Sequence, residues 1–103
     1  MRYAELRINA FAARSMVYRT ARLAETGRNV VNEGSACKVF ATEALHEVID
    51  GAIQLTGGNS LTVGHPLERL YREARVLRIA EGASDVLRIN LAKGRLELDL
   101  GEI

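Results

Sequence analysis

Apolar side chains recur at steps of three or four residues along most of this chain, and that spacing predicts helices. Residues 2–26 contain neither glycine nor proline and are expected to form one amphipathic helix that stops near Gly27. Charged side chains such as Arg7, Arg14 and Arg22 fall outside its expected buried stripe. That stripe consists of Leu6, Ala10, Ala13, Val17, Ala21 and Ala24.

A second helix is predicted from about Asn29 or Asn32 to Leu55, with Gly34 and Gly51 as its interruptions. Its apolar positions are rich in alanine and cover much of the circumference, so neighbouring helices can approach on more than one side. They are Ala36, Val39, Phe40, Ala44, Val48, Ala52 and Leu55. The pair of glycines at 57–58 suits a C-terminal cap, because such caps need a backbone with positive φ.

Residues 57–65 are expected to form a loop, and Pro66 then suits the first position of a third helix. This helix is predicted to continue to about Ile79, with Glu68 near its positively polarised N-terminus. A further short helix follows a break at Gly82. The fold class is therefore all-α, an antiparallel helical bundle.

The short fourth helix is expected to be capped by Ser84 and to end near Gly94. The tail, residues 95–103, alternates leucines with charged residues. A strand would show this alternation, but a frayed end or a segment packed on the helices is the preferred interpretation.

Composition places the chain among ordinary globular domains, with 103 residues, 48% hydrophobic, and a formal net charge of +1. This charge gives no long-range field to hold nucleic acid or an anionic membrane. No apolar run approaches the ~18 residues that a membrane span needs, and the first residues do not begin a signal peptide. A single cysteine excludes an intrachain disulfide and a thiolate zinc site, and a cytoplasmic setting is expected.

Arginines recur every three residues from Arg69 to Arg78, which invites a phosphate-binding interpretation. Such spacing spreads them around a helix, and Glu68 and Glu73 lie four positions from Arg72 and Arg69. Ion pairs within the helix are therefore preferred over contact with an anion or nucleic acid.

Three other polar or reactive residues carry a structural interpretation. His46 has no second histidine one helical turn away, so a core or boundary position is preferred and no metal site is predicted. His65 precedes Pro66 and is expected to cap a helix or lie on the surface. Cys37 is expected to be a small core residue.

Glu81 is the first candidate for chemistry. It follows the C-terminus of a helix, precedes Gly82 and has apolar neighbours. The negatively polarised helix end and the apolar setting both disfavour the ionised carboxylate, so they are expected to raise its pKa toward that of a general base. A solvated acid at a helix end is the alternative. The second candidate is the glycine pair after Gln54, where a ligand or another chain can approach the backbone closely; a simple helix stop is the alternative.

Four segments, taken in order, resemble the C-terminal domain of the acyl-CoA dehydrogenase family over about residues 1–94. They are 36–43 (ACKVFATE), 54–60 (QLTGGNS), 66–75 (PLERLYREAR) and 79–86 (IAEGASDV). The resemblance implies a four-helix domain that lacks its first helix here. It also implies that residues 1–103 are a partial domain, without the helical and β-barrel domains that precede it in the family.

The resemblance implies an FAD-dependent oxidoreductase that converts an acyl-CoA to a trans-2-enoyl-CoA and passes electrons to an electron-transfer flavoprotein. Glu81 corresponds to the base that removes the α-proton, and Ala80 and Gly82 to substrate-binding positions. The expected FAD contacts are Gln54, Leu55, Thr56, Gly57 and Gly58 toward a neighbouring subunit's FAD, and Ala83, Ser84 and Asp85 toward that of their own subunit. A dimer or tetramer is expected.

The chain departs from the family pattern at Ala80, Ala83 and Asp85, where tyrosine, threonine and glutamate or glutamine are usual. Some family members also carry the base on an earlier helix. The chain alone is expected to be inactive and not to retain FAD. An alternative is a non-catalytic helical oligomerisation module derived from the same domain.

Overall fold

The computed structural model describes residues 1–98 and 100–103, and in them the chain is helical without a strand. The all-α prediction is therefore confirmed. The elements are α1 (Arg2–Glu25), α2 (Val31–Thr56), the short 3₁₀-helix η1 (Gly58–Leu61), α3 (Pro66–Leu77), α4 (Ser84–Lys93) and the π-helical turn η2 (Gly94–Leu98). No helix of the described part is long and apolar enough to cross a membrane.

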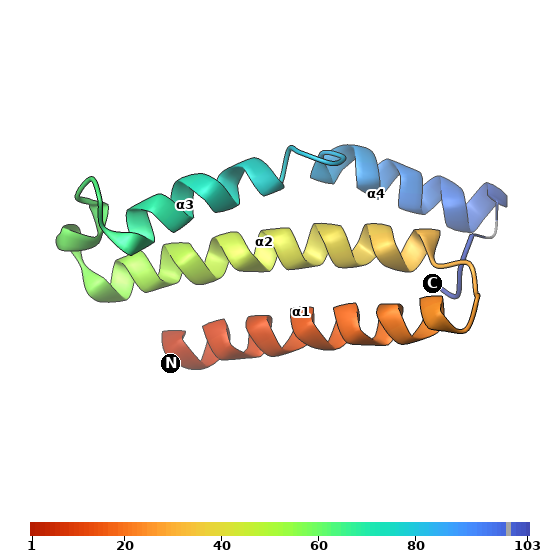
Figure 1. Ribbon diagram of the computed structural model, residues 1–103, viewed down its shortest axis with the longest axis horizontal. Coiled ribbons are helices and arrows are strands. Elements are labelled where there is room, and N and C mark those ends of the chain that lie inside the picture. Colours follow the sequence, from red (N-terminus) through yellow and green to blue (C-terminus); the bar gives the residue numbers. More distant parts are fainter. Residues whose placement is uncertain (99) are drawn as a thin grey trace.

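Helix α2 is the centre of the molecule (Figure 1). Helix α1 runs antiparallel along one side of it, and α3 and α4 lie end to end along the other side. Among the described residues, α1 packs on α2 and not on the backbone of α3 or α4. The result is an elongated body of 48 × 24 × 22 Å, an open layer of antiparallel helices in which α2 has partners on both sides.

The helix ends follow the sequence signals closely. Gly57 ends α2 with a φ of +87°, and its N–H donates to the Ile53 carbonyl at 2.8 Å. Pro66 is the first residue of α3, and the Nδ1 atom of His65 accepts a 3.1 Å hydrogen bond from the Leu67 N–H. The predicted glycine stop, proline start and histidine cap are thus confirmed.

Three local predictions need correction. The stretch expected to be a loop contains η1, and α3 ends at Leu77, two residues before the expected Ile79. Ser84 does not cap α4: Ala83 holds the cap position without a side-chain hydrogen bond. Ser84 is instead the first helical residue, and its side chain is buried.

The buried apolar core is small. Among the described residues it consists of Cys37, Ala44, Ile49 and Ala74, and α1 contributes no buried residue. The stripe expected on α1 is only partly right, because Leu6 and Ala13 are half-buried but Ala10, Val17, Ala21 and Ala24 are exposed. Apolar residues lie on several sides of α1, so the pattern alone could not select the packed side. The residues of α1 that are half-buried include Leu6, Asn9, Ala13, Met16, Thr20 and Leu23.

Gly51 explains how α1 and α2 come close together. A Cβ atom at this position would lie 2.7 Å from a terminal methyl group of Leu6, so the absence of a side chain makes room for it. A glycine in the middle of a helix weakens the helix by about 1 kcal/mol relative to alanine. Close contact between the two helices offsets part of that loss.

The tail returns to the start of α2. The backbone N–H of Asn32 donates to the Leu100 carbonyl at 3.3 Å, and its side-chain amide donates to the Ile103 carbonyl at 3.1 Å. Glu102 forms an ion pair of 3.0 Å with Arg19 of α1. These contacts attach the described end of the chain to the corner where α1 meets α2.

Candidate functional site

The turn between α3 and α4 carries the candidate base. Glu81 has a φ of +55°, and the next residue, Gly82, has a φ of +96°. Among the described residues Glu81 is the one non-glycine residue with positive φ. A non-glycine residue in this region is uncommon, and such residues concentrate at functional sites.

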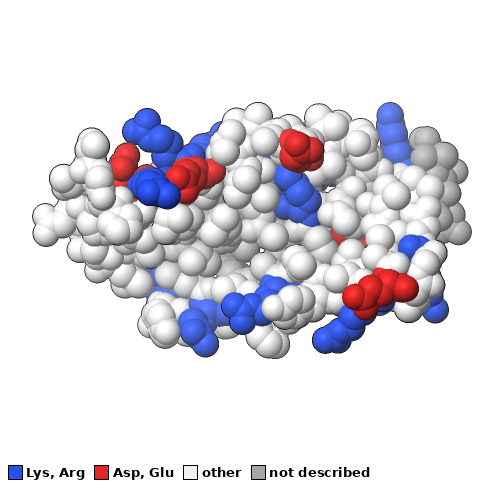
Figure 2. Space-filling model, in the orientation of Figure 1, with Lys and Arg blue, Asp and Glu red and all other residues white. Residues whose placement is uncertain are grey.

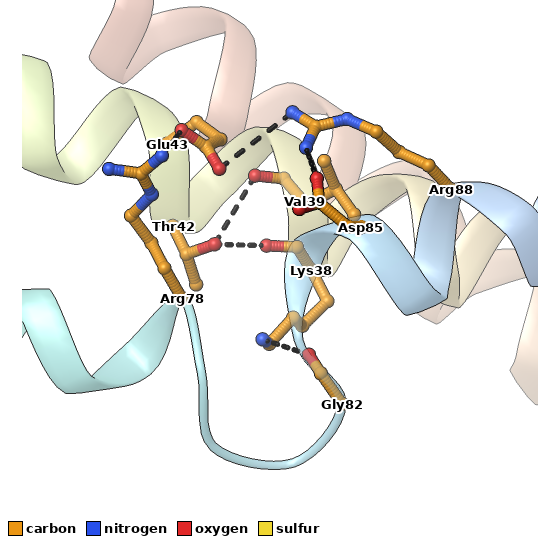
Figure 3. Close-up of polar contacts among 8 residues, drawn as sticks. All are labelled: Lys38, Val39, Thr42, Glu43, Arg78, Gly82, Asp85 and Arg88. Atoms are coloured by element: carbon orange, nitrogen blue, oxygen red, sulfur yellow. Dashed lines mark hydrogen bonds and ion pairs between the residues drawn. The ribbon is translucent and has the colours of Figure 1, made fainter.

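Several contacts define the shape of this turn. The N–H of Ser84 donates to the Arg78 carbonyl at 3.0 Å and closes it. The ammonium of Lys38 on α2 donates to the Gly82 carbonyl at 2.6 Å (Figure 3). A Cβ atom on Gly82 would lie 3.0 Å from Leu87, so the turn also lies close against α4.

A cluster of charged side chains lies beside the turn (Figure 3). Glu43 of α2 pairs with Arg78 at 2.9 Å and with Arg88 of α4 at 3.7 Å, and Arg88 also pairs with Asp85 at 3.1 Å. Burial alone would raise the pKa of Glu43, but the neighbouring Ser84 hydroxyl, Arg78 and Arg88 outweigh it and lower that pKa. The Ser84 hydroxyl lies outside the geometry of a regular hydrogen bond. Glu43 thus links α2 to α4 and to the residue that directly follows α3.

The residues predicted to hold substrate lie together on the turn. The apolar surroundings expected around the Glu81 carboxylate, however, are not found. Ala80 and Gly82 are half-buried on either side of Glu81, whereas Glu81 itself is exposed. Within the described residues, no apolar shell covers this carboxylate. Its side chain is therefore accessible from solvent.

The glycine pair after α2 is open on its outer side. Gln54 and Leu55 are exposed, and a Cβ atom added to Gly57 or Gly58 would meet no atom within 4 Å. Thr56 is also exposed, but its hydroxyl donates to the Ala52 carbonyl at 2.8 Å. The space beside the backbone is therefore open, so a ligand or a second chain can approach it closely.

Ser60 supports this glycine turn from the inside. Its hydroxyl, which is buried, donates to the Gly57 carbonyl at 2.6 Å and to the Ile53 carbonyl at 3.3 Å. The sequence places Ser60 inside a recognised motif but gives no sign of this role.

The residues expected beside the cofactor at the start of α4 differ in accessibility. Ala83 is half-buried, and Ser84 is 6% exposed with its hydroxyl turned inward. The Asp85 side chain is 94% exposed. This group and the 54–58 group lie at opposite ends of α3 (Figure 1), whose 12 residues give a separation of about 18 Å. The two groups therefore form separate surfaces.

The arginine repeat forms ion pairs as predicted. Arg69 pairs with Glu73 at 2.9 Å, and Arg72 pairs with Glu68 at 3.3 Å. Figure 2 shows charges of both signs side by side over α3. The Arg78–Glu43 pair was not predicted, because it joins residues far apart in the sequence.

The structural interpretations of the histidine and the cysteine also hold. His46 is half-buried and stacks at a tilt on Tyr71, with ring centroids 4.9 Å apart. Cys37 is buried, with its Sγ 3.1 Å from the Thr20 hydroxyl. The described residues contain no group of three or more His, Cys, Asp or Glu side chains that could hold a metal ion.

Comparison with known proteins assigns the chain to a family. The family described as "Acyl-CoA dehydrogenase, C-terminal domain" matches residues 1–96. The chain therefore belongs to the acyl-CoA dehydrogenase family, as its C-terminal helical domain.

Enzymes that act on CoA thioesters are among its relatives. A cyclohexane-1-carbonyl-CoA dehydrogenase of Geobacter metallireducens is 35% identical over 82 residues, which are 80% of this chain and 22% of that enzyme. An acyl-CoA dehydrogenase of Bacillus subtilis is 37% identical over 90 residues, 87% of this chain and 24% of the enzyme. An acryloyl-CoA reductase (NADH) of Anaerotignum propionicum is 33% identical over 90 residues, 87% of this chain and 23% of the enzyme. The chain thus spans about a quarter of these relatives.

Proposed function

We propose that this chain is the C-terminal portion of an FAD-dependent acyl-CoA dehydrogenase, with Glu81 as the base that removes the α-proton of the substrate. The observation that carries the proposal is the left-handed backbone of Glu81, in an exposed turn fastened to α2 and α4. Family membership and the names of the dehydrogenase relatives support the reaction class.

The proposed chemistry uses the carboxylate of Glu81 in a simple way. The α C–H bond of the acyl thioester breaks, and its proton moves to a Glu81 oxygen. The electron pair left behind forms the Cα=Cβ bond as the β-hydrogen departs as hydride. When bound, FAD would supply the acceptor for that hydride.

Exposure of Glu81 fits this role once a substrate is bound. A thioester seated over the turn would remove water from the carboxylate, and desolvation makes a carboxylate a stronger base. Ala80 and Gly82 beside it are small, so they leave room for the acyl thioester group of the substrate near Glu81. Ala80 replaces the larger tyrosine that is usual in the family, so the wall of the pocket would be more open here.

The residues expected to contact FAD fit a cofactor at two separate places. Gly57 and Gly58 offer open backbone, with Gln54 exposed beside them. At the start of α4, the exposed carboxylate of Asp85 remains accessible, whereas the Ser84 hydroxyl faces inward. The ~18 Å between the two places supports contacts with the cofactors of two different subunits.

An electron-transfer flavoprotein is proposed as the redox partner and an acyl-CoA as the substrate. A relative from Acetobacterium woodii that is named as a subunit of a caffeyl-CoA reductase–Etf complex is 37% identical over 75 residues of this chain. Because other relatives are named as reductases, the same residues would also serve the reverse reaction, with protonated Glu81 returning the α-proton.

A second candidate is a non-catalytic oligomerisation module built on the same helices. The large apolar side chains left exposed on α1 and α2 favour it, among them Phe11, which is 74% exposed. The two candidates are separated by anaerobic mixing of the complete FAD-containing protein with a saturated acyl-CoA. Bleaching of the flavin band supports the dehydrogenase, and an unchanged spectrum with both saturated and unsaturated thioesters supports the module.

A further inference from the structure

We infer that Lys38 is a positioning residue, which holds the turn that carries Glu81 through the carbonyl of Gly82. The inference rests on the proposed function, because it concerns where the base is held. Lys38 itself is not proposed to touch the substrate.

The contact joins two elements that are distant in the sequence. Lys38 lies on α2 and is half-buried, and its Nζ atom lies 2.6 Å from the Gly82 carbonyl oxygen. Figure 3 shows the side chain leaving α2 and reaching into the turn between α3 and α4. A hydrogen bond from an ammonium group is stronger than one between neutral groups.

The turn needs such a contact because of its backbone. Glu81 and Gly82 adopt positive φ in succession, and a non-glycine residue holds that conformation only when its surroundings define it. Glu81 is exposed, so its own side chain does not anchor it. The bond between Ser84 and Arg78 closes the turn, but it does not attach the turn to α2.

Helix α2 holds this turn at both of its ends. Glu43 pairs at 2.9 Å with Arg78, where the turn begins, and Lys38 binds Gly82, near where it ends. On α2, the Thr42 hydroxyl donates to the Lys38 carbonyl at 2.8 Å. The position of Glu81 is thereby fixed relative to α2, the most extensively packed helix of the chain.

Fixing the base matters for rate more than for affinity. Catalytic groups work within about 0.5 Å of the productive geometry, and a displacement of ~1 Å can cost on the order of 10²-fold. Without the Lys38 ammonium, the turn would sample other backbone conformations. The thioester would still bind, but Glu81 would less often lie in line with the α-proton.

The test compares Lys38→Met with Lys93→Met in the complete FAD-containing enzyme. Lys93 is the other lysine of the chain and is exposed near the end of α4. For Lys38→Met we expect the limiting rate of flavin reduction to fall about 10- to 100-fold, with substrate Kd changed less than about threefold. Lys93→Met should match the wild type, and Lys38→Arg, which keeps a charged donor, should restore most of the rate.

A second readout does not depend on activity. Hydrogen exchange of the backbone amides in residues 79–87 should become faster in Lys38→Met, while exchange in α1 stays unchanged. Unchanged exchange in that segment, or a normal rate of flavin reduction, would overturn the inference.

The proposed function and this inference can fail separately. If Glu81→Gln abolishes flavin reduction while Lys38→Met reduces flavin normally, Lys38 has no positioning role and the proposed function stands. If Glu81→Gln retains the rate, the base assignment fails, and hydrogen exchange alone decides whether Lys38 holds the turn. If Lys38→Met does not fold, Lys38→Gln replaces it, since glutamine is polar but too short to reach Gly82. Failure of both variants to fold would overturn the inference in favour of a purely structural role.

Discussion

The side-chain oxygen of Asn32 occupies the space that a Cβ atom on Gly94 would need. Asn32 is 1% exposed, and its amide group donates to the Ile103 carbonyl, so it has little freedom to move away. The φ of Gly94 is −58°, which any residue can adopt. The requirement for glycine at this position is therefore one of space and not of backbone conformation.

Gly94→Ala should consequently destabilise the chain by about 1–3 kcal/mol, because the added methyl group displaces a buried, hydrogen-bonded amide. Gly34→Ala is the matched control, since a Cβ at this α2 position meets no atom within 4 Å. It should stabilise the helix by up to about 1 kcal/mol. Urea unfolding followed by circular dichroism measures both, and equal stability of the two variants would contradict the packing argument.

The lowered pKa of Glu43 predicts a loss of stability in acid. Because the pKa is lower in the folded chain than in the unfolded chain, the unfolded chain binds more protons near the ordinary glutamate pKa. Stability is thus complete above that value and is lost as the pH falls through the folded pKa. Glu43→Gln should flatten this part of the stability curve, whereas Glu25→Gln, at an exposed position on α1, should leave its slope close to that of the wild type.

Glu81→Gln in the complete enzyme should abolish turnover while sparing the binding of substrate. The amide keeps the shape of the side chain but cannot accept the proton, and general bases contribute about 10²–10⁴-fold or more. Stopped-flow flavin reduction with a saturated acyl-CoA is the measurement. A variant that reduces its flavin within about threefold of wild type would place the base on another residue.

The chain alone should associate into at least a dimer. A groove of about 450 Å³ lies between α1, α2 and α4, with Val39, Phe40 and Leu91 in its wall. Exposed apolar surface of this kind is typical of interfaces. Sedimentation equilibrium at tens of micromolar should give more than the 11.3 kDa monomer mass, and Phe40→Glu should weaken the association. A monomer at that concentration would contradict the prediction.

Residues 1–103 alone should not retain FAD. The resemblance places the flavin ring in a β-barrel domain, and the open backbone at Gly57 and Gly58 offers only one edge of a dinucleotide site. The absorbance spectrum after incubation with FAD and dialysis should therefore lack a flavin band. A yellow protein after dialysis would show that these helices bind the cofactor unaided.

Local signals in the sequence predicted the helices and their ends well. Gly57, Pro66 and His65 act through the backbone of their immediate neighbours, so a short window of sequence contains the information. The same is true of the ion pairs that Arg69 and Arg72 form within one helix.

Local sequence signals could not predict contacts between residues that are far apart in the sequence. The packed side of α1 depends on which of several apolar faces meets α2. The inward-facing Ser84 lies beside Glu43, which belongs to another helix. Lys38 and Gly82 are 44 positions apart, so only the folded chain brings them together. The family resemblance points to Glu81, but the left-handed backbone of this residue is a property of the folded turn that no local sequence signal predicts.

The attachment of α1 to a single neighbour has a consequence for how the chain opens. Because α1 has no fully buried residue and packs on α2 alone among the described helices, its separation would leave the contacts of α3 and α4 with α2 in place. We expect α1 to detach as an independent unit, in fluctuations that leave α2, α3 and α4 folded. Partial unfolding would thus begin at α1, on the side of α2 away from Glu81. The turn between α3 and α4 would keep its shape while α1 separates from α2 and returns.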